Sequence, residues 1–464
     1  MLVPINLTGG TYKHPSLPLS AQVTRNFWPQ QIDNPSAKSS YVLESWPGLT
    51  LLGSGTGADG GQFEHNGTLY HVCGTTLYSV ASDGTHTSLG TITGTGPCIF
   101  DALGSSIAIV RGGVVSVWNG TTLSTVAGVE TPNSCSHLNN QMLYDGDAGR
   151  FCVSDVGALG TINALNYATA ESLADDLLRV YAFSDQVYLF GNKTIELWWN
   201  SGVGNPPFDR VQNATIKIGL KALHSVASNK DSLYFLGTDS RVYRVSGGQS
   251  LAVTDRAMAR AIEEYSDASD AIGWCFTKDD QYFYQITFPT ADKSFIYPEG
   301  GQWFEVSSGV TGARYIGNSY SYAHGRHLIG DYQNGNLYEL SDSTYTENGS
   351  VIRRVRDTGP LHGGLMRAQG KRLEMNRFEL IMETGVGIVS GQGSDPVVML
   401  SFSDDGGRTF CTETWGTIGQ LGAYRWKIEW FALGSFDSRI VRVAISDPVK
   451  VSIHSAAADI EIGI

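Results

Sequence analysis

Short strands in which hydrophobic and polar residues alternate recur along the chain. A turn followed by a strand of the type Leu-Tyr-x-apolar occurs seven times, with the strands beginning near residues 69, 107, 142, 187, 233, 282 and 328. Steps of about 35 to 49 residues are the spacing of four-stranded propeller blades. Since one such sheet cannot bury both of its faces, neighbouring sheets must stack around an axis. The pattern predicts an all-β protein with a β-propeller of seven blades, or of six with one hairpin outside the ring.

The pattern changes towards both ends of the chain. Residues 1–60 are rich in Pro, Gly and Ser and contain no clear repeat, which predicts an extended N-terminal arm. The propeller is expected over residues 61–345. After it, strands such as Val397–Phe402 and Ile440–Ile445 follow at shorter and less regular intervals. They predict a C-terminal antiparallel β-sandwich, or platform domain, over residues 346–464, which the N-terminal arm could complete.

One helix is expected within the propeller region. Thr254 or Asp255 can cap it, and Met258, Ile262 and Tyr265 then fall on one face. This spacing favours a helix that packs against a blade, and a binding helix is the alternative.

Composition supports many tight turns and an acidic protein. Glycine contributes 55 of the 464 residues, and pairs such as Asn66-Gly67 and Asn334-Gly335 are typical of hairpin turns. The net charge of −13 disfavours tight general binding to DNA phosphates. An acidic wall can still serve beside DNA that must slide past without adhering. Charge alone does not choose between that role and solubility.

Cysteines and hydrophobic segments indicate neither a metal site nor a membrane protein. The six cysteines show no CxxC and no zinc-finger spacing, so buried free thiols are expected. The first residues lack the features of a secretory signal, and no stretch approaches the ~18 apolar residues of a membrane helix. No metal ligand, cofactor site or membrane partner is predicted.

Three features could carry chemistry, and each has a structural explanation. Ser403–Phe410 fits the Asp-box pattern S-x-D-x-G-x-T-W with Phe in place of Trp, and such a box braces a hairpin away from the active site in sialidase-like propellers. Adjacent acids such as Asp175-Asp176 are more often solvated than catalytic. Trp198-Trp199 favours packing between blades over sugar stacking. No catalytic residue is predicted.

A basic segment stands out in this acidic chain. Over residues 351–380, seven basic side chains face three acidic ones. The segment is either a solvated loop or a surface that docks an acidic partner, including another copy of this chain. Its residues form a candidate assembly interface: Arg353, Arg354, Arg356, Arg367, Lys371, Arg372 and Arg377.

Several segments, in their shared order, resemble the packaged-DNA stabilisation proteins of short-tailed bacteriophages, also described as tail hub or nozzle proteins. They are Tyr41–Leu49, Tyr70–Gly74 followed by Leu77-Tyr78, Gly191–Glu196, the helix at 255–265, the turn at 300–304, Ser403–Gly407 and Ser446–Val449. The resemblance runs through most of the chain.

The resemblance implies a virion component made in the host cytoplasm and located in the tail. Six copies would form a ring below the portal and its adaptor proteins and carry the DNA channel to a plug or needle, with tailspikes or fibres as further partners. Such a protein completes the head, retains the packaged genome and lets DNA pass without sequence-specific binding. It has no catalytic residues to carry over. A propeller glycosidase or carbohydrate-binding tail protein is the alternative, motivated by the Asp-box and Trp198-Trp199.

Overall fold

The computed structural model describes residues 2–129, 131–147, 149–170 and 175–463. The chain divides into two compact units that interleave along the sequence. Unit 1 comprises residues 1–50, 293–315 and 341–464, and unit 2 comprises residues 51–292 and 316–340. No described helix combines the length and apolar character that crossing a bilayer requires. The predicted divisions at residues 60/61 and 345/346 stay predictions.

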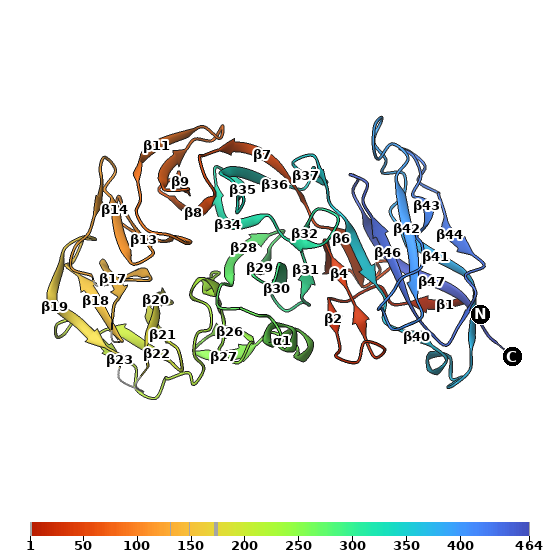
Figure 1. Ribbon diagram of the computed structural model, residues 1–464, viewed down its shortest axis with the longest axis horizontal. Helices are drawn as coiled ribbons and strands as arrows, with labels where there is room; N and C mark the ends of the chain where they lie inside the picture. The colour runs from red at the N-terminus through yellow and green to blue at the C-terminus, as the bar shows by residue number, and fades with distance from the viewer. Residues whose placement is uncertain (1, 130, 148, 171–174, 464) are drawn as a thin grey trace. The chain divides into compact units, whose positions relative to one another are not determined.

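Unit 2 is a β-propeller whose antiparallel sheets follow one another around a ring (Figure 1). Five sheets have four strands: β8 (Asp59–His65), β9 (Thr68–Cys73), β10 (Thr76–Val80) and β11 (His86–Thr91); β12 (Ile99–Leu103), β13 (Ser106–Arg111), β14 (Val114–Trp118) and β15 (Leu123–Thr125); β16 (Cys135–Leu138), β17 (Gln141–Asp145), β18 (Arg150–Ser154) and β19 (Ile162–Thr169); β20 (Leu177–Phe183), β21 (Gln186–Gly191), β22 (Ile195–Asn200) and β23 (Phe208–Arg210); β24 (Ala227–Ser228), β25 (Leu233–Leu236), β26 (Val242–Ser246) and β27 (Gln249–Ala252).

A sixth blade is formed by β34 (Gly317–Ala323), β35 (Arg326–Asp331) and β36 (Asn336–Ser341), and β7 (Gly48–Ser54) pairs with β36 as its fourth strand. Between the fifth and sixth blades lies the hairpin of β28 (Ile272–Lys278) and β29 (Gln281–Phe288), and β28 contacts both β24 and β34. The β-propeller fold is therefore confirmed, with six blades of four strands each. The hairpin lies within the ring of unit 2 and not outside it.

Hairpin turns in unit 2 use residues that tolerate a positive φ. Between β8 and β9, Asn66 has a φ of 52° and Gly67 a φ of 80°, while His65 pairs with Thr68 across the turn. Positive φ at both central residues matches the right-handed twist of the flanking strands, and Asn-Gly is the pair that adopts it most readily. The turn predicted at this pair is thus confirmed.

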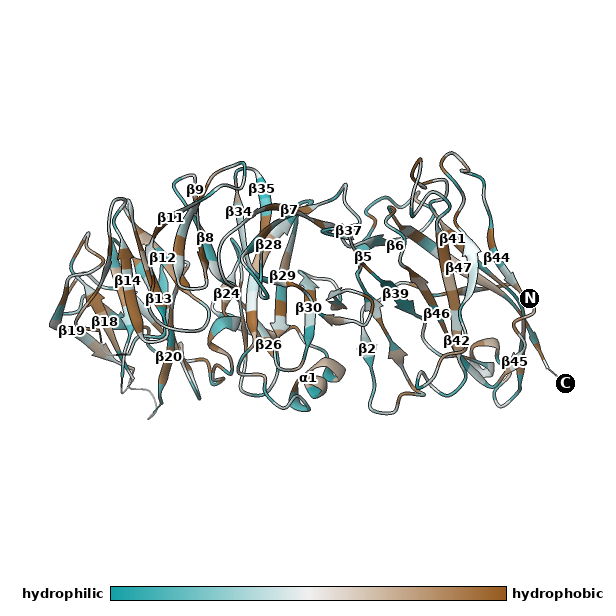
Figure 2. Cartoon of the chain, turned by 45° about the horizontal axis from the view of Figure 1, so that its top comes forward, coloured by the Kyte–Doolittle hydropathy of each residue, from teal (hydrophilic) through white to brown (hydrophobic). Residues whose placement is uncertain are grey.

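Neighbouring blades pack through large apolar side chains. Phe151 of β18 is fully buried, and its ring meets the edge of Trp198 of β22 with 5.2 Å between the ring centroids. Trp198 also donates from Nε1 to Glu196 Oε2 at 3.0 Å. Trp199, on the other face of the strand, is 46% exposed. Trp198 therefore packs between two blades. Other strands of unit 2, such as β14, also consist largely of hydrophobic residues (Figure 2).

The expected helix is α1 (Arg256–Glu263). Asp255 caps it by accepting from Met258 N at 2.8 Å. Its buried residues include Met258 and Ile262, which were predicted to share a face. Unit 2 also contains the short 3₁₀ helix η1 (Leu223–Ser225).

The ring of unit 2 closes where its first blade meets its last. Asp59 of β8 accepts hydrogen bonds from Asn318 Nδ2 (3.0 Å) and Ser319 Oγ (2.9 Å) of β34. The Asp59 side chain is fully buried. A Cβ atom at Gly330 would lie 2.4 Å from Asp59 Oδ1, so only glycine leaves room for this carboxylate. The closing contact therefore depends on a buried charge that is satisfied by neighbouring strands.

Unit 1 contains two facing sheets. The strands of the first are β1 (Leu2–Ile5), β5 (Phe27–Gln31), β6 (Tyr41–Ser45), β41 (Leu373–Met382), β44 (Ile428–Phe431), β45 (Ser435–Phe436) and β47 (Ser452–Ile462). The strands of the second include β4 (Thr24–Arg25), β31 (Phe304–Glu305), β39 (Arg354–Asp357), β40 (Leu361–His362), β42 (Val397–Ser403), β43 (Thr414–Thr417) and β46 (Ser438–Ile445). Phe378 and Leu380 of the first sheet share one apolar core with Val398 and Val443 of the second. The C-terminal β-sandwich is thus confirmed.

The N-terminal strands complete the sandwich. β1 and β6 both pair with β47, and β4 pairs with β39. The remaining short elements of unit 1 are β2 (Tyr12–Lys13), β3 (Ala21–Gln22), β30 (Lys293–Pro298), β32 (Ser307–Ser308), β33 (Ala313–Arg314), β37 (Thr346–Glu347), β38 (Ser350–Val351) and η2 (Gly363–Met366); β7 (Gly48–Ser54) crosses from unit 1 into unit 2.

Replacing Asn318 by Ala tests the closing contact of the ring. The change leaves Asp59 Oδ2 without the donor at 3.0 Å. We expect the free energy of unfolding to fall by about 1–3 kcal/mol, because a buried charged acceptor loses a partner. Chemical denaturation of the purified chain measures the loss. Gln333→Ala, at an exposed position of the same blade, should stay within about 0.5 kcal/mol of the wild type; equal stabilities of the two variants would contradict the role of Asp59.

Candidate functional site

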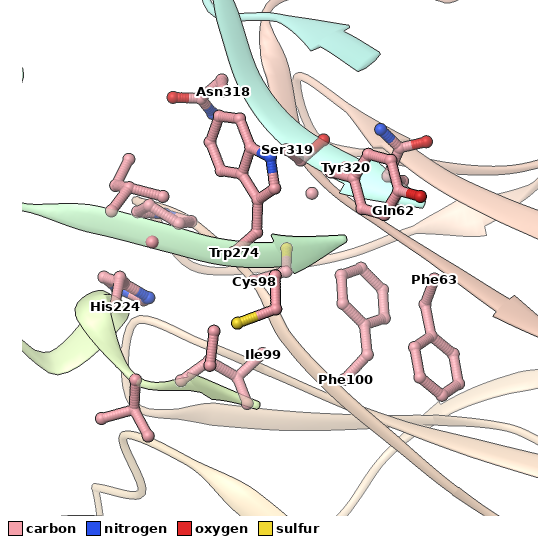
Figure 3. Close-up of a pocket in the computed structure, with 18 of the residues that line it drawn as sticks. Gln62, Phe63, Cys98, Ile99, Phe100, His224, Trp274, Asn318, Ser319 and Tyr320 are labelled. Carbon is pink, nitrogen blue, oxygen red and sulfur yellow. The ribbon is translucent and has the colours of Figure 1, made fainter. Parts of the chain in front are cut away.

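The first strands of six sheets converge on a cavity of about 410 Å³ in unit 2 (Figure 3). β8 supplies Gln62 and Phe63, β12 supplies Phe100, and β34 supplies Ser319 and Tyr320. The rings of Phe63 and Phe100 stack with 5.8 Å between their centroids. The lining strands β8, β12, β20, β24, β28 and β34 each lie at one end of their sheet.

A buried arginine sets the electrostatics of the cavity. Arg179 of β20 is 7% exposed and donates from Nη1 to the carbonyl oxygen of Leu223 at 2.5 Å. Its guanidinium lies 5.3 Å from the centroid of the Tyr181 ring. Burial, and to a lesser extent Arg179, lower the pKa of the neighbouring His224 to about 3, so the imidazole is neutral at physiological pH.

The cavity offers hydrogen-bond donors beside aromatic faces. Trp274 Nε1 and Arg179 Nε are buried and have no hydrogen-bond partner among the described residues. Burial raises the pKa of the Cys98 thiol to about 12, so this sulfur is protonated. Glycoside cleavage by two carboxylates would need Asp or Glu side chains here, and the described lining contains neither.

The basic segment does not form one surface. The side chains of Arg354 and Arg356, both in β39, are fully buried within unit 1. Arg356 donates to Thr24 Oγ1 at 2.6 Å and to Gln22 Oε1 at 3.0 Å, and Arg354 donates to the carbonyl oxygen of Tyr345 at 3.2 Å. Burial lowers the pKa of each guanidinium to about 10. The expectation that these two arginines are available to a partner is therefore wrong, because both are used to hold unit 1 together.

The other five basic residues fall into two groups. Arg353 is paired with Glu413, and Arg377 donates from Nη1 to Glu429 Oε1 at 2.8 Å. Arg367, Lys371 and Arg372 are exposed, at and after the end of η2. Within the described part of the chain, none of these three side chains forms an ion pair. Three neighbouring cations thus remain available at the surface of unit 1.

The Asp-box is a structural brace. Asp405 accepts from Arg408 N (2.9 Å), Thr409 N (3.0 Å) and Thr409 Oγ1 (2.6 Å). These bonds and one from Ser403 hold the pKa of Asp405 well below its usual range. The preceding Asp404 accepts from Arg439 Nε and Nη2, each at 2.7 Å. The prediction that this motif shapes a hairpin is confirmed.

Comparison with models of protein families shows to which family the chain belongs. Residues 1–345 match the family model described as bacteriophage P22 Gp10, beta-propeller, and residues 360–461 match the one described as bacteriophage P22 Gp10, beta-sandwich. The chain belongs to the P22 Gp10 family. It is therefore a phage structural protein of the tail hub type, as the sequence resemblance implied. A comparison with curated proteins gives no match.

Solved structures similar to this Gp10-family chain share little sequence identity with it. The WD40 domain of Pan2 from Neurospora crassa is 11% identical, with 63% of this chain and 96% of that chain covered and a TM-score of 0.42. A catalytically inactive virginiamycin B lyase from Staphylococcus aureus, solved with quinupristin, is 10% identical, with coverages of 68% and 99% and a TM-score of 0.43. No functional inference follows from likeness at this level.

Charge reversal separates the buried from the exposed arginines of this Gp10-family protein. In Arg356→Glu a carboxylate would face oxygen acceptors such as Gln22 Oε1 in a buried site. We expect a loss of more than about 4 kcal/mol in the free energy of unfolding, seen as insoluble chain or a lost unfolding transition. Arg372→Glu, at an exposed position, should change it by less than about 0.5 kcal/mol. A soluble Arg356→Glu chain with wild-type stability would refute the structural role of Arg356.

Proposed function

We propose that this chain is a structural virion protein of the tail hub or nozzle of a short-tailed phage. It completes the head after DNA packaging, retains the packaged genome and forms part of the channel through which DNA is ejected. The observation that carries the proposal is the order of the two Gp10 matches, a propeller followed by a sandwich, over most of the chain. In this proposal the protein acts by assembly and not as an enzyme.

The physical properties of the chain are compatible with a conduit for DNA. A closed propeller is a stiff body, because each sheet is packed against two neighbours. The net charge of −13 opposes adhesion of the phosphate backbone. A channel wall that does not bind DNA would not slow the ejection of the genome.

The proposed assembly is a ring of six copies below the portal-adaptor proteins. A plug or needle, with tailspikes or fibres, would bind beyond it in the virion tail. Unit 1 offers a docking site for such partners in the three exposed cations Arg367, Lys371 and Arg372. An acidic chain supplies complementary charge for them, so an adjacent copy or an acidic adaptor surface is the proposed counterpart.

A lysate grown without this chain tests the proposed role. DNA-filled and empty heads are counted by electron microscopy after infection with a phage carrying a nonsense mutation in this gene. We expect mostly empty heads that lack the distal tail, because nothing seals the genome after packaging. Supplying the wild-type chain from a plasmid should restore filled heads. Stable filled heads that fail only to bind or digest host polysaccharide would instead support the carbohydrate-binding alternative.

Charge reversal of the three exposed cations tests the docking site. Purified wild-type chain is added to heads from the deficient lysate, and protection of the genome from nuclease is titrated. We expect Arg367→Glu/Lys371→Glu/Arg372→Glu to require at least about tenfold more protein, since several attractive charge pairs become repulsive.

A second triple variant provides the matched control. Lys38→Glu/Lys230→Glu/Lys427→Glu makes the same change in net charge at exposed positions elsewhere. It should protect heads like the wild type, and both variants should keep the wild-type unfolding transition. Equal titration of the two variants would remove the docking site from the proposal while leaving the hub function intact.

A further inference from the structure

Two histidines and a cysteine meet in the first blade of unit 2. His71 and Cys73 are two residues apart on β9, so their side chains leave the same face of the strand. His86 begins β11 of the same sheet. One ligand atom from each residue lies within 4.8 Å of those of the other two. The cluster is outside the central cavity and has no part in the proposed docking site.

Hydrogen bonds fix which ring nitrogens face one another. His71 Nε2 lies 2.9 Å from Asp59 Oδ1, and His86 Nδ1 lies 2.9 Å from the carbonyl oxygen of Gly84. A carboxylate and a carbonyl can only accept, so both of these nitrogens carry the ring proton. The opposite nitrogens, His71 Nδ1 and His86 Nε2, then present lone pairs to each other across 3.0 Å. Two lone pairs that face each other at this distance repel, unless a cation lies between them.

Cys73 brings a sulfur next to the same imidazole. Its Sγ lies 3.3 Å from His71 Nδ1 and 3.4 Å from His71 Nε2. A shared proton would satisfy the two nitrogens alone, whereas a metal ion would bind the sulfur as well. With Zn–N bonds of about 2.0–2.1 Å and a Zn–S bond of about 2.3 Å, tetrahedral ligands stand about 3.3 Å (N to N) and about 3.6 Å (N to S) apart. His71 Nδ1 lies about 0.3 Å nearer than this to both His86 Nε2 and Cys73 Sγ, and the ligand atoms of the three residues lie within 4.8 Å of one another. Rotation of the side chains would bring the sulfur towards the Nδ1 edge of the ring, where one ion could bind all three.

We propose that His71 Nδ1, Cys73 Sγ and His86 Nε2 bind one Zn²⁺, with water as the fourth ligand. Binding converts the Cys73 thiol to a thiolate and releases its proton to solvent. A mixed nitrogen and sulfur set suits this borderline-soft ion better than Mg²⁺ or Ca²⁺, which take oxygen ligands.

The surroundings support a site built for a metal. Asp59 and the Gly84 carbonyl orient the two imidazoles, the arrangement that commonly supports zinc-bound histidines. His71 and Cys73 are fully buried, while His86 is half-buried between exposed Thr85 and Thr87. The ion can therefore reach its ligands from the side of β11. Asp59, which holds His71, also accepts a hydrogen bond from Asn318, so hydrogen bonds link the proposed site to the closing contact of the ring.

Metal binding by the purified full-length chain tests the proposal. The protein is treated with a chelator, supplied with Zn²⁺ under reducing conditions and dialysed, and bound zinc is measured by mass spectrometry. We expect one zinc per chain, with affinity reduced at least about tenfold in His86→Gln and Cys73→Ser. Cys98→Ser and the exposed Cys411→Ser should bind as the wild type does, which excludes uptake at other thiols.

Cobalt provides a second readout that does not depend on a buried substitution. Co²⁺ in the wild-type site should give the absorption of a tetrahedral ion and a thiolate-to-cobalt charge-transfer band. His86→Gln, at the half-buried edge, should weaken cobalt binding even if Cys73→Ser does not fold. Absence of zinc and cobalt from the wild-type chain, or affinity unchanged in His86→Gln, would overturn the proposal.

Discussion

The fold of unit 2 depends on one buried charge. Asp59 lies where the first blade meets the last, and it accepts hydrogen bonds from Asn318 and Ser319 across that boundary. Stacked blades leave two ends that must be joined, because an open ring would expose the apolar face of each end. A buried carboxylate is costly unless every lone pair has a donor. Gly330 supplies the space and the neighbouring strands supply the donors, so this boundary is specific as well as tight.

In unit 1, buried arginines join neighbouring segments of the chain, as Asp59 does in unit 2. Arg354 and Arg356 are fully buried and donate largely to neutral oxygens, including Thr24 Oγ1 and the Tyr345 carbonyl. Through Thr24, Arg356 ties the N-terminal strand β4 to β39 by a side-chain hydrogen bond in addition to the backbone ladder. Positive charge in the basic segment is thus divided between buried arginines that stabilise unit 1 and three exposed cations. The arginines of β39 that are buried have a structural role, and the exposed cations at and after the end of η2 are the ones that we propose bind partners.

Local patterns predicted the architecture well and the sites poorly. Alternation along each strand and the interval between repeats were sufficient for the propeller, and Asn66-Gly67 was sufficient for its turn. The burial of Arg356 could not be predicted in this way, because its partners Gln22 and Thr24 lie about 330 residues away in the sequence. Arg354 donates to the carbonyl oxygen of Tyr345, a backbone group that no side-chain pattern reveals. Arg179 and His224 meet only because different blades converge. The grouping of His71 and Cys73 with His86 likewise requires the folded sheet, since their spacing matches no familiar metal motif.

The central claim is that the chain is a hub component surrounding the path of DNA in the tail. Electron cryomicroscopy of purified virions, with a tag fused to this chain to mark its position, tests that claim most directly. The account predicts a ring of propeller-sandwich subunits at the tail vertex, below the portal and around the DNA channel. Density for the chain only at the tips of peripheral fibres, or its absence from purified virions, would contradict it.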